Sequence, residues 1–231
     1  MRFTAIDEKL LTCARAVARV KVPQIVSGNM KQIPTGTAWL VTPNLALTCW
    51  HVIEARGSNS SSIRASDLQE QIAHSTLTFD FAQPGEGIEY GIERLEHEDI
   101  NLDYALLRLR DRPDYPLEKW GFLKLDADAP LTLQTQFYVV QHPQGQPKQL
   151  SGGFFVKFTS DSKILHDAPT EPGTSGAPVL NVTNFRVVAL HNGENEAAKL
   201  REATTIKAIL ADLKQHRPEL YDEMVVLSKQ N

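Results

Sequence analysis

The chain has 231 residues, enough for one large domain or for two small lobes that share an interface. Its hydrophobic content of 42% and charged content of 23% are ordinary for a soluble globular protein. The formal net charge of −4, with lysines and arginines scattered along the chain, argues against nucleic acid as the main partner. No stretch approaches the roughly 20 apolar residues that cross a bilayer, so we expect no membrane partner.

The chain contains two cysteines, Cys13 and Cys49. A secreted enzyme of this size would usually carry several disulfides, and the N-terminal residues include no apolar segment of signal-peptide length. We therefore expect a soluble cytoplasmic protein with reduced thiols. No histidines or cysteines occur in pairs at the spacing of metal ligands, so the sequence predicts no metal and no cofactor.

The first half of the chain changes from helical to strand-like spacing. Apolar residues over 7–20 recur at helical intervals, and residues 1–21 are therefore assigned to an N-terminal helix. Residues 36–41 and 45–50 are β-like runs on either side of a Pro-Asn turn, which predicts a hairpin. The serine-rich stretch 57–70 predicts a mobile surface loop.

The second half is also rich in short apolar runs. Tyr104–Leu109 is a strong strand candidate before a proline-containing linker at 110–119, and residues 137–140, 154–158 and 187–190 are candidates after it. Many short strands in two groups, with helices only at the chain ends, predict an all-β core of two barrels or sandwiches.

Helical spacing returns near the C-terminus. Ile206, Ile209, Leu210 and Leu213 predict a helix, which Pro218 should break before a further helical turn. The expected organisation is an N-terminal helix at 1–21, a first β lobe at 22–112, a second β lobe with its linker at 113–200 and a C-terminal helical segment at 201–231.

Three side chains are candidates for acyl-transfer chemistry. His51 ends a predicted strand, Asp103 precedes another, and Ser175 lies in a turn between Gly173 and Gly176. This chemistry needs a hydroxyl nucleophile, an imidazole base and a carboxylate that orients the imidazole. Each residue alone has an ordinary explanation as a packed, capping or turn residue. Their joint occurrence at strand ends and in a glycine-rich loop favours a catalytic group.

The order of the three residues separates two hydrolase classes. An α/β-hydrolase has the order Ser, acid, His, with Gly-x-Ser-x-Gly between a strand and a helix. Here the order is His51, Asp103, Ser175, and Ala177 stands where the second glycine of that motif would be. An esterase or lipase of that fold is therefore disfavoured.

Five segments together carry a family resemblance: 36–41, 47–52, 103–107, 139–145 and 170–179. They resemble the chymotrypsin-like (trypsin-like) serine proteases, and most of all the bacterial branch that contains the glutamyl endopeptidases and related trypsin-like peptidase domains. The resemblance covers roughly residues 30–195. It implies two six-stranded antiparallel β-barrels with the active site between them, to which this chain adds N-terminal and C-terminal helices.

The resemblance also implies a role for each candidate residue. Ser175 would be the nucleophile and His51 the general base, which then serves as general acid for the leaving amine. Asp103 would hold the imidazole tautomer and stabilise the imidazolium. The backbone N–H groups of Gly173 and Ser175 would form the oxyanion hole, where loss of one donor typically costs about 3 kcal/mol of transition-state stabilisation.

The sequence departs from the digestive members of the family just before Ser175. Thr174 stands where they have an aspartate that receives a new N-terminal amine after zymogen cleavage, so that switch is absent. Pro169 stands where trypsin has its pocket aspartate, which removes the usual basis for cleavage after Lys or Arg. In glutamyl endopeptidases a Thr and a His at the places of Thr170 and His191 line the primary (S1) pocket. The resemblance thus implies a preference for Glu, Asp or Gln before the cut.

Two functional classes follow from these residues. We expect a serine endopeptidase that acts on protein or peptide substrates and is controlled by a regulatory protein partner. The alternative is a binding or signalling module that uses the peptide cleft without cleavage. The intact set of His51, Asp103 and Ser175 favours the enzyme, because a module that only binds has no need of all three.

Overall fold

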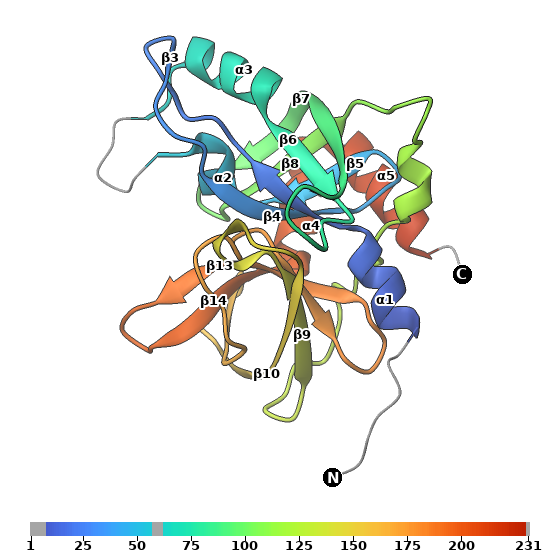
Figure 1. The fold of residues 1–231 in the computed structure, drawn as a ribbon. Coiled ribbons are helices and arrows are strands. Elements are labelled where there is room, and N and C mark those ends of the chain that lie inside the picture. The colour runs from blue at the N-terminus through green and yellow to red at the C-terminus, as the bar shows by residue number, and fades with distance from the viewer. Residues whose placement is uncertain (1–7, 57–61, 230–231) are drawn as a thin grey trace.

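The computed structural model describes residues 8–56 and 62–229. Within them the chain forms two closed barrels, one above the other in Figure 1. The first barrel consists of β1 (Val17–Lys21), β4 (Thr35–Leu40), β5 (Leu45–Thr48), β6 (Thr76–Phe79), β7 (Ile88–Asp99) and β8 (Tyr104–Leu109). The second consists of β9 (Gln136–Gln141), β10 (Gln149–Phe158), β11 (Lys163–His166), β12 (Pro178–Asn181), β13 (Val187–Asn195) and β14 (Leu200–Thr205). The expected core of two six-stranded antiparallel barrels is confirmed.

The remaining elements lie around the barrels (Figure 1). They are the small sheet of β2 (Ile25–Val26) and β3 (Asn29–Met30), the helices α1 (Glu8–Arg15), α2 (Trp50–Glu54), α3 (Ala65–His74), α4 (Ile206–His216) and α5 (Pro218–Lys229), and short 3-10 turns at Leu117–Trp120 and Pro143–Gly145. None of the described helices is long and apolar enough to cross a bilayer.

The strand register follows the apolar pattern of the sequence. The predicted hairpin forms between β4 and β5, with Trp39 opposite Leu47. Trp39, Phe79 and Tyr104 are fully buried in the first barrel, and Phe137 is among the buried residues that fill the second. Apolar side chains on the inward face of each strand therefore close both barrels around packed interiors.

The N-terminal helix is shorter than the sequence predicts. Helix α1 ends at Arg15, and residues 17–21, assigned to that helix within 1–21, instead form β1 of the first barrel. Strand β1 pairs with both β4 and β6, so these pairings close the barrel. Its Val-Ala-Arg-Val sequence also fits strand alternation, and the non-local pairing decides between the two periods.

Two further boundaries differ from those expected. Residues 65–74 form α3, so the loop prediction for 57–70 is wrong over its last part, while 57–61 lie outside the described residues. Residues 200–205 form β14, which pairs with β11 and β13 and closes the second barrel. The second lobe therefore extends past residue 200, and the C-terminal helical segment begins at Ile206 rather than at 201.

The terminal helices cross between the barrels: α4 and α5 follow the second barrel but pack against the first, and α1 precedes the first barrel but contacts the second. The side chains of Ile209, Leu213 and Met224, from α4 and α5, are buried in the larger core cluster, which consists mostly of residues of the first barrel. Helix α1 precedes the first barrel, yet Cys13 Sγ lies 3.7 Å from the carbonyl oxygen of Phe185, in the β12–β13 turn of the second.

Candidate active site

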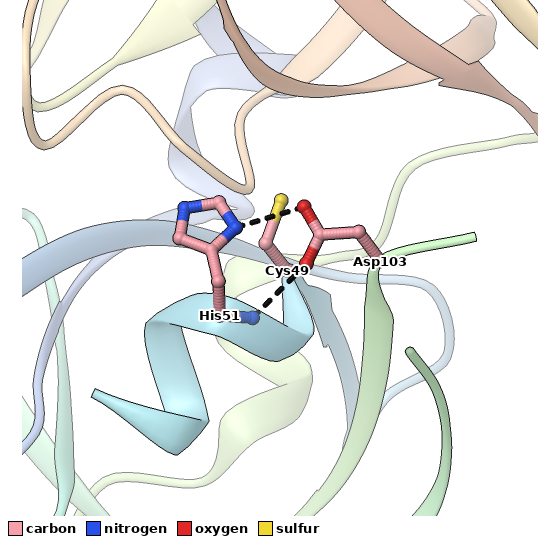
Figure 2. A group of neighbouring side chains, drawn as sticks. All are labelled: Cys49, His51 and Asp103. Atoms are coloured by element: carbon pink, nitrogen blue, oxygen red, sulfur yellow. Dashed lines mark hydrogen bonds and ion pairs between the residues drawn. The ribbon is translucent and has the colours of Figure 1, made fainter. Parts of the chain in front are cut away.

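His51 and Asp103 come from neighbouring elements of the first barrel. Strand β5 leads into the single helical turn α2, which carries His51, and Asp103 ends the turn between β7 and β8. The His51 Nδ1 atom lies 2.8 Å from Asp103 Oδ2, and the His51 main-chain N–H donates to Oδ1 at 3.0 Å (Figure 2). Both carboxylate oxygens thus fix the position and rotation of one histidine.

The backbone and the surroundings of Asp103 favour this arrangement. Its φ of 55° is in the left-handed region, which aspartate tolerates better than most residues. Burial alone would raise the pKa of Asp103, but the hydrogen bonds and charge of His51 and the charge of Lys163 outweigh it and lower that pKa. Asp103 is therefore ionised at neutral pH, and it can stabilise a positively charged imidazole.

The Ser175 turn depends on two glycines with positive φ. Gly173 has φ 95° and Gly176 has φ 89°. A Cβ atom at Gly176 would lie 2.1 Å from the main-chain oxygen of Thr37, and one at Gly173 would lie 2.7 Å from that of His142. No other residue fits either position without a backbone shift, because both space and φ forbid a side chain.

The turn is also attached to the first barrel. The N–H of Thr37 in β4 donates to the carbonyl oxygen of Ser175 at 2.9 Å, and its hydroxyl donates to that of Gly173 at the same distance. Because Ser175 belongs to the second barrel, these bonds fix its turn relative to the barrel that carries His51. His51, Gly173 and Ser175 line one cleft.

The hydrogen-bonding groups of the turn face different partners. The hydroxyl of Ser175 donates to the main-chain oxygen of Asn192 at 3.1 Å. Among the described residues, the N–H groups of Gly173 and Ser175 donate to no main-chain carbonyl. Two adjacent amide donors at a cleft can stabilise a developing oxyanion.

Asn192 in β13 is a site residue that the sequence analysis missed. Its Nδ2 donates to the main-chain oxygen and to Oδ2 of Asp103, both at 3.1 Å. Its Oδ1 accepts from Lys163 Nζ at 3.1 Å and from Thr204 Oγ1 at 2.7 Å. Lys163 Nζ also donates to the carbonyl oxygen of Leu102 at 3.3 Å. A buried polar network from the second barrel thus supports the carboxylate of the first.

Thr174, beside the nucleophile candidate, is completely buried. Its hydroxyl donates to Gln141 Oε1 at 2.5 Å and accepts from the N–H of Glu171 at 3.2 Å. The amide of Gln141 in turn donates to the carbonyl oxygen of Pro169 at 3.1 Å. Uncharged hydrogen bonds therefore brace the turn.

The two residues expected in the S1 pocket have different surroundings. His191 is 2% exposed, whereas Thr170 is half-buried. His191 Nδ1 lies 3.3 Å from His166 Nε2 on β11. Burial, reinforced by the neighbouring His166, Arg201 and His51, lowers the pKa of His191 well below its usual value. Burial likewise lowers the pKa of His166 to about 4, so both rings are neutral at pH 7.

A family model described as "Trypsin-like peptidase domain" matches residues 36–190. The chain belongs to this family. The match includes His51, Asp103 and Ser175, and leaves α1, α4 and α5 outside it. The chain thus contains a trypsin-like peptidase domain, and its terminal helices lie outside the matched residues.

Individual relatives of the peptidase domain are distant and longer. The uncharacterized protein y4fB of Sinorhizobium fredii (strain NBRC 101917 / NGR234) is 28% identical over 206 residues, covering 80% of this chain and 28% of that protein. Serine protease FAM111B of Homo sapiens is 23% identical over 272 residues, covering 96% of this chain and 36% of that protein. The peptidase domain spans about a third of the length of these relatives.

A solved structure supports the fold of the peptidase domain. The serine endoprotease from Yersinia pestis superposes with a TM-score of 0.65 at 14% identity, covering 98% of this chain and 68% of that chain. Such a likeness extends over both barrels.

Cys49 lies beside the His51–Asp103 pair of the peptidase domain (Figure 2). Its thiol donates to the carbonyl oxygen of His191 at 3.2 Å, and no disulfide joins it to Cys13. Burial and the charge of Asp103 raise the pKa of this thiol well above its usual value. Cys49 is therefore a protonated packing residue at neutral pH and a poor nucleophile or metal ligand.

Proposed function

We propose that the domain is a serine endopeptidase in which Ser175, His51 and Asp103 form the catalytic triad. One observation carries the proposal: His51, whose Nδ1 atom lies 2.8 Å from Asp103 Oδ2, lines the same cleft as Ser175 and Gly173. A base oriented by a carboxylate beside a hydroxyl in a glycine-rich turn is suited to acyl transfer.

The reaction would proceed in two halves. His51 takes the proton of the Ser175 hydroxyl as its oxygen attacks the scissile carbonyl, and the N–H groups of Gly173 and Ser175 stabilise the oxyanion. His51 then protonates the leaving amine, the C–N bond breaks, and an acyl-enzyme remains. Water, deprotonated by His51, attacks this ester and releases the acid and free Ser175.

The hydroxyl of Ser175 has to turn before it reacts. It donates to the main-chain oxygen of Asn192 in the substrate-free protein. Rotation about its Cα–Cβ bond would redirect it towards His51 Nε2. Serine rotamers interconvert rapidly, and catalytic hydrogen bonds often form only in the substrate complex.

A fluorophosphonate probe tests this assignment, because it labels only an activated serine. We expect stoichiometric labelling of the wild type and loss of labelling in Ser175→Ala and His51→Ala. The matched control is Ser160→Ala, which changes an exposed serine of the β10–β11 turn. Absence of labelling in folded wild type, or unchanged labelling in Ser175→Ala, would refute the triad.

We further propose that Thr170 and His191 select an acidic residue, Glu over Asp, or Gln before the cut. The neutral His191 receives a hydrogen bond at Nδ1 when His166 donates from Nε2, which leaves the proton of His191 on Nε2. That N–H and the hydroxyl of Thr170 could both donate to a substrate carboxylate or amide oxygen.

A peptide library cleaved by the wild type decides the specificity. Cleavage after Glu, Asp or Gln is expected, and His191→Ala should reduce it more than cleavage after other residues. The control is His74→Ala, which changes an exposed histidine at the end of α3. Cleavage mainly after Lys, Arg or large apolar residues would contradict the pocket role without affecting the triad.

The second candidate function is a binding module that holds peptides in the cleft without cleaving them. The bond from the Ser175 hydroxyl to Asn192, rather than to His51, is the observation that favours it. Such a module would bind peptides equally well with and without Ser175→Ala, and it would not react with the fluorophosphonate.

We also propose that a protein partner regulates the peptidase. We further propose that the peptidase acts in the cytoplasm. The exposed faces of α1, α4 and α5, which lie outside the family match, offer surfaces for a partner. The absence of a disulfide between the two cysteines suits a reducing compartment. Fractionation of cells would locate the native peptidase, and a partner that co-purifies with it from the cytoplasmic fraction and changes its activity would support both ideas.

A further inference from the structure

A group of histidine and aspartate side chains joins α4 to the first barrel outside the catalytic cleft. His97 comes from β7, and Asp212 and His216 lie one turn apart on α4. His97 Nε2 is 3.1 Å from Asp212 Oδ2, and His216 Nδ1 is 2.8 Å from Asp212 Oδ1. Their potential ligand atoms all lie within 4.8 Å of one another. Segments far apart in sequence thus present two imidazoles and one carboxylate to a common point.

These separations suit a small transition-metal ion. Zinc binds imidazole nitrogen and carboxylate oxygen at about 2.0–2.2 Å in tetrahedral geometry, which places neighbouring donor atoms about 3.3 Å apart. The His97–Asp212 separation of 3.1 Å is close to this value, and the His216–Asp212 separation of 2.8 Å would have to widen when the ion binds. Two imidazoles and a carboxylate favour zinc over calcium or magnesium, which prefer all-oxygen surroundings.

A neighbouring residue holds the carboxylate in place. The hydroxyl of Tyr104 donates to Asp212 Oδ2 at 2.5 Å. Carboxylates that bind metals are commonly oriented by such outer hydrogen bonds. The side chain of Asp212 is 10% exposed and that of His97 19%, whereas that of His216 is 50% exposed. The group is therefore fixed on the protein side and open to water and ions on the other.

We propose that His97, Asp212 and His216 bind one Zn²⁺ ion, with a water molecule as the fourth ligand. The ion replaces the protons that now lie between the rings and the carboxylate, so each imidazole carries its proton on its other nitrogen. It ties α4 to β7 and, through the hydrogen bond between Asp212 and Tyr104, to the residue that directly follows Asp103. The site is a structural or regulatory one, separate from the peptidase reaction.

Zinc titration of the full chain tests the site, measured by calorimetry after treatment with a chelator. The titration uses His51→Ala, because His51 and Asp103 could take an ion of their own. We expect about one equivalent of Zn²⁺ to bind and the midpoint of thermal unfolding to rise. Adding His216→Ala should weaken binding at least tenfold, and Tyr104→Phe about tenfold. Co²⁺ in place of Zn²⁺ should give the intense visible absorption of a tetrahedral site.

The control for histidine loss is His74→Ala on α3, which should leave the zinc affinity unchanged. His216 is half exposed near the end of α4, so its alanine variant should fold, and circular dichroism verifies this. His97→Ala provides an independent test from the strand side. No saturable binding, or equal affinity with and without His97 and His216, would overturn the proposal and leave a hydrogen-bonded cluster only.

Discussion

Asn192 Nδ2 donates to both the main-chain oxygen and Oδ2 of Asp103, at 3.1 Å each. Asn192 belongs to the second barrel and Asp103 to the first. The bond therefore sets the position of the proposed catalytic carboxylate across the interface between the barrels. Because Asn192 contacts Asp103 and not the scissile bond, it is a positioning residue.

Asn192→Ala should lower kcat by up to about 10²-fold while KM changes little, because a misplaced base slows the chemical step more than substrate binding. Steady-state kinetics on a peptide ester or amide measures kcat and KM separately. Asn192→Ser, which keeps a donor, should recover part of the loss. Asn195→Ala, further along β13, is the control. Equal kcat in Asn192→Ala and wild type would exclude the role.

Asp103→Asn should lower kcat about 10⁴-fold at neutral pH. The amide would donate to His51 Nδ1, which forces the proton of the ring onto Nε2 and removes its ability to accept from Ser175. Turnover and fluorophosphonate labelling should fall together. Asp161→Asn, on an exposed turn, should behave like wild type. A variant that retains more than a tenth of wild-type kcat would speak against Asp103 as the orienting acid.

Stability should fall as the pH falls below about 6.5. Burial lowers the pKa of His142 to about 3 and that of His166 to about 4, while both titrate near 6.5 in the unfolded chain. The unfolded state then binds more protons below pH 6.5. Their stabilising contribution is present above that pH and is lost as pH falls towards the folded-state values, at up to about 1.4 kcal/mol per pH unit for each ring.

Urea unfolding at pH 7.5, 6.0 and 5.0 measures this slope. His166→Gln should be less stable than wild type at pH 7.5 but lose less stability on acidification. His74→Gln should follow the wild-type curve. A wild-type stability that is flat between pH 7.5 and 5.0 would contradict neutral burial of these imidazoles.

Gly176→Ala should destabilise the protein by more than about 2 kcal/mol. The positive φ alone costs an L-residue about 1–2 kcal/mol, and the new Cβ would lie 2.1 Å from the oxygen of Thr37. Thermal unfolding detects the change. Gly91→Ala is matched to it, since Gly91 lies in β7 with nothing within 4 Å of the added Cβ, and it should unfold near the wild-type temperature.

The barrels and the proposed triad could be predicted because their signals are local. Alternating apolar residues define most strands, and His51, Asp103 and Ser175 lie in short motifs at strand ends. The spacing of residues 17–21 and 200–205 alone did not reveal that they are strands. Strand β1 is fixed by β4 and β6, and β14 is fixed by β11 and by its hairpin with β13. The same applies to Asn192, whose donor faces a residue 89 positions away.

The surroundings of His191 could not be predicted from the sequence. The sequence predicts a strand that ends before it, whereas β13 continues through His191 to Asn195. Its burial and its contact with His166 depend on the pairing of β11, β13 and β14 around the second barrel. No pattern within the strand itself indicates that two histidines meet there.

The terminal helices have a consequence for a broken chain. Helix α1 lies against the second barrel through Cys13, and α4 and α5 complete the core of the first. A cut within the linker at 110–119 would give two fragments. The first would contact the second barrel through α1, and the second would pack α4 and α5 against the first barrel. We expect such fragments to reassociate without a covalent link, so the linker is the place to divide this protein into complementing halves. Removal of α4 and α5 would instead leave the first barrel with an uncovered apolar face.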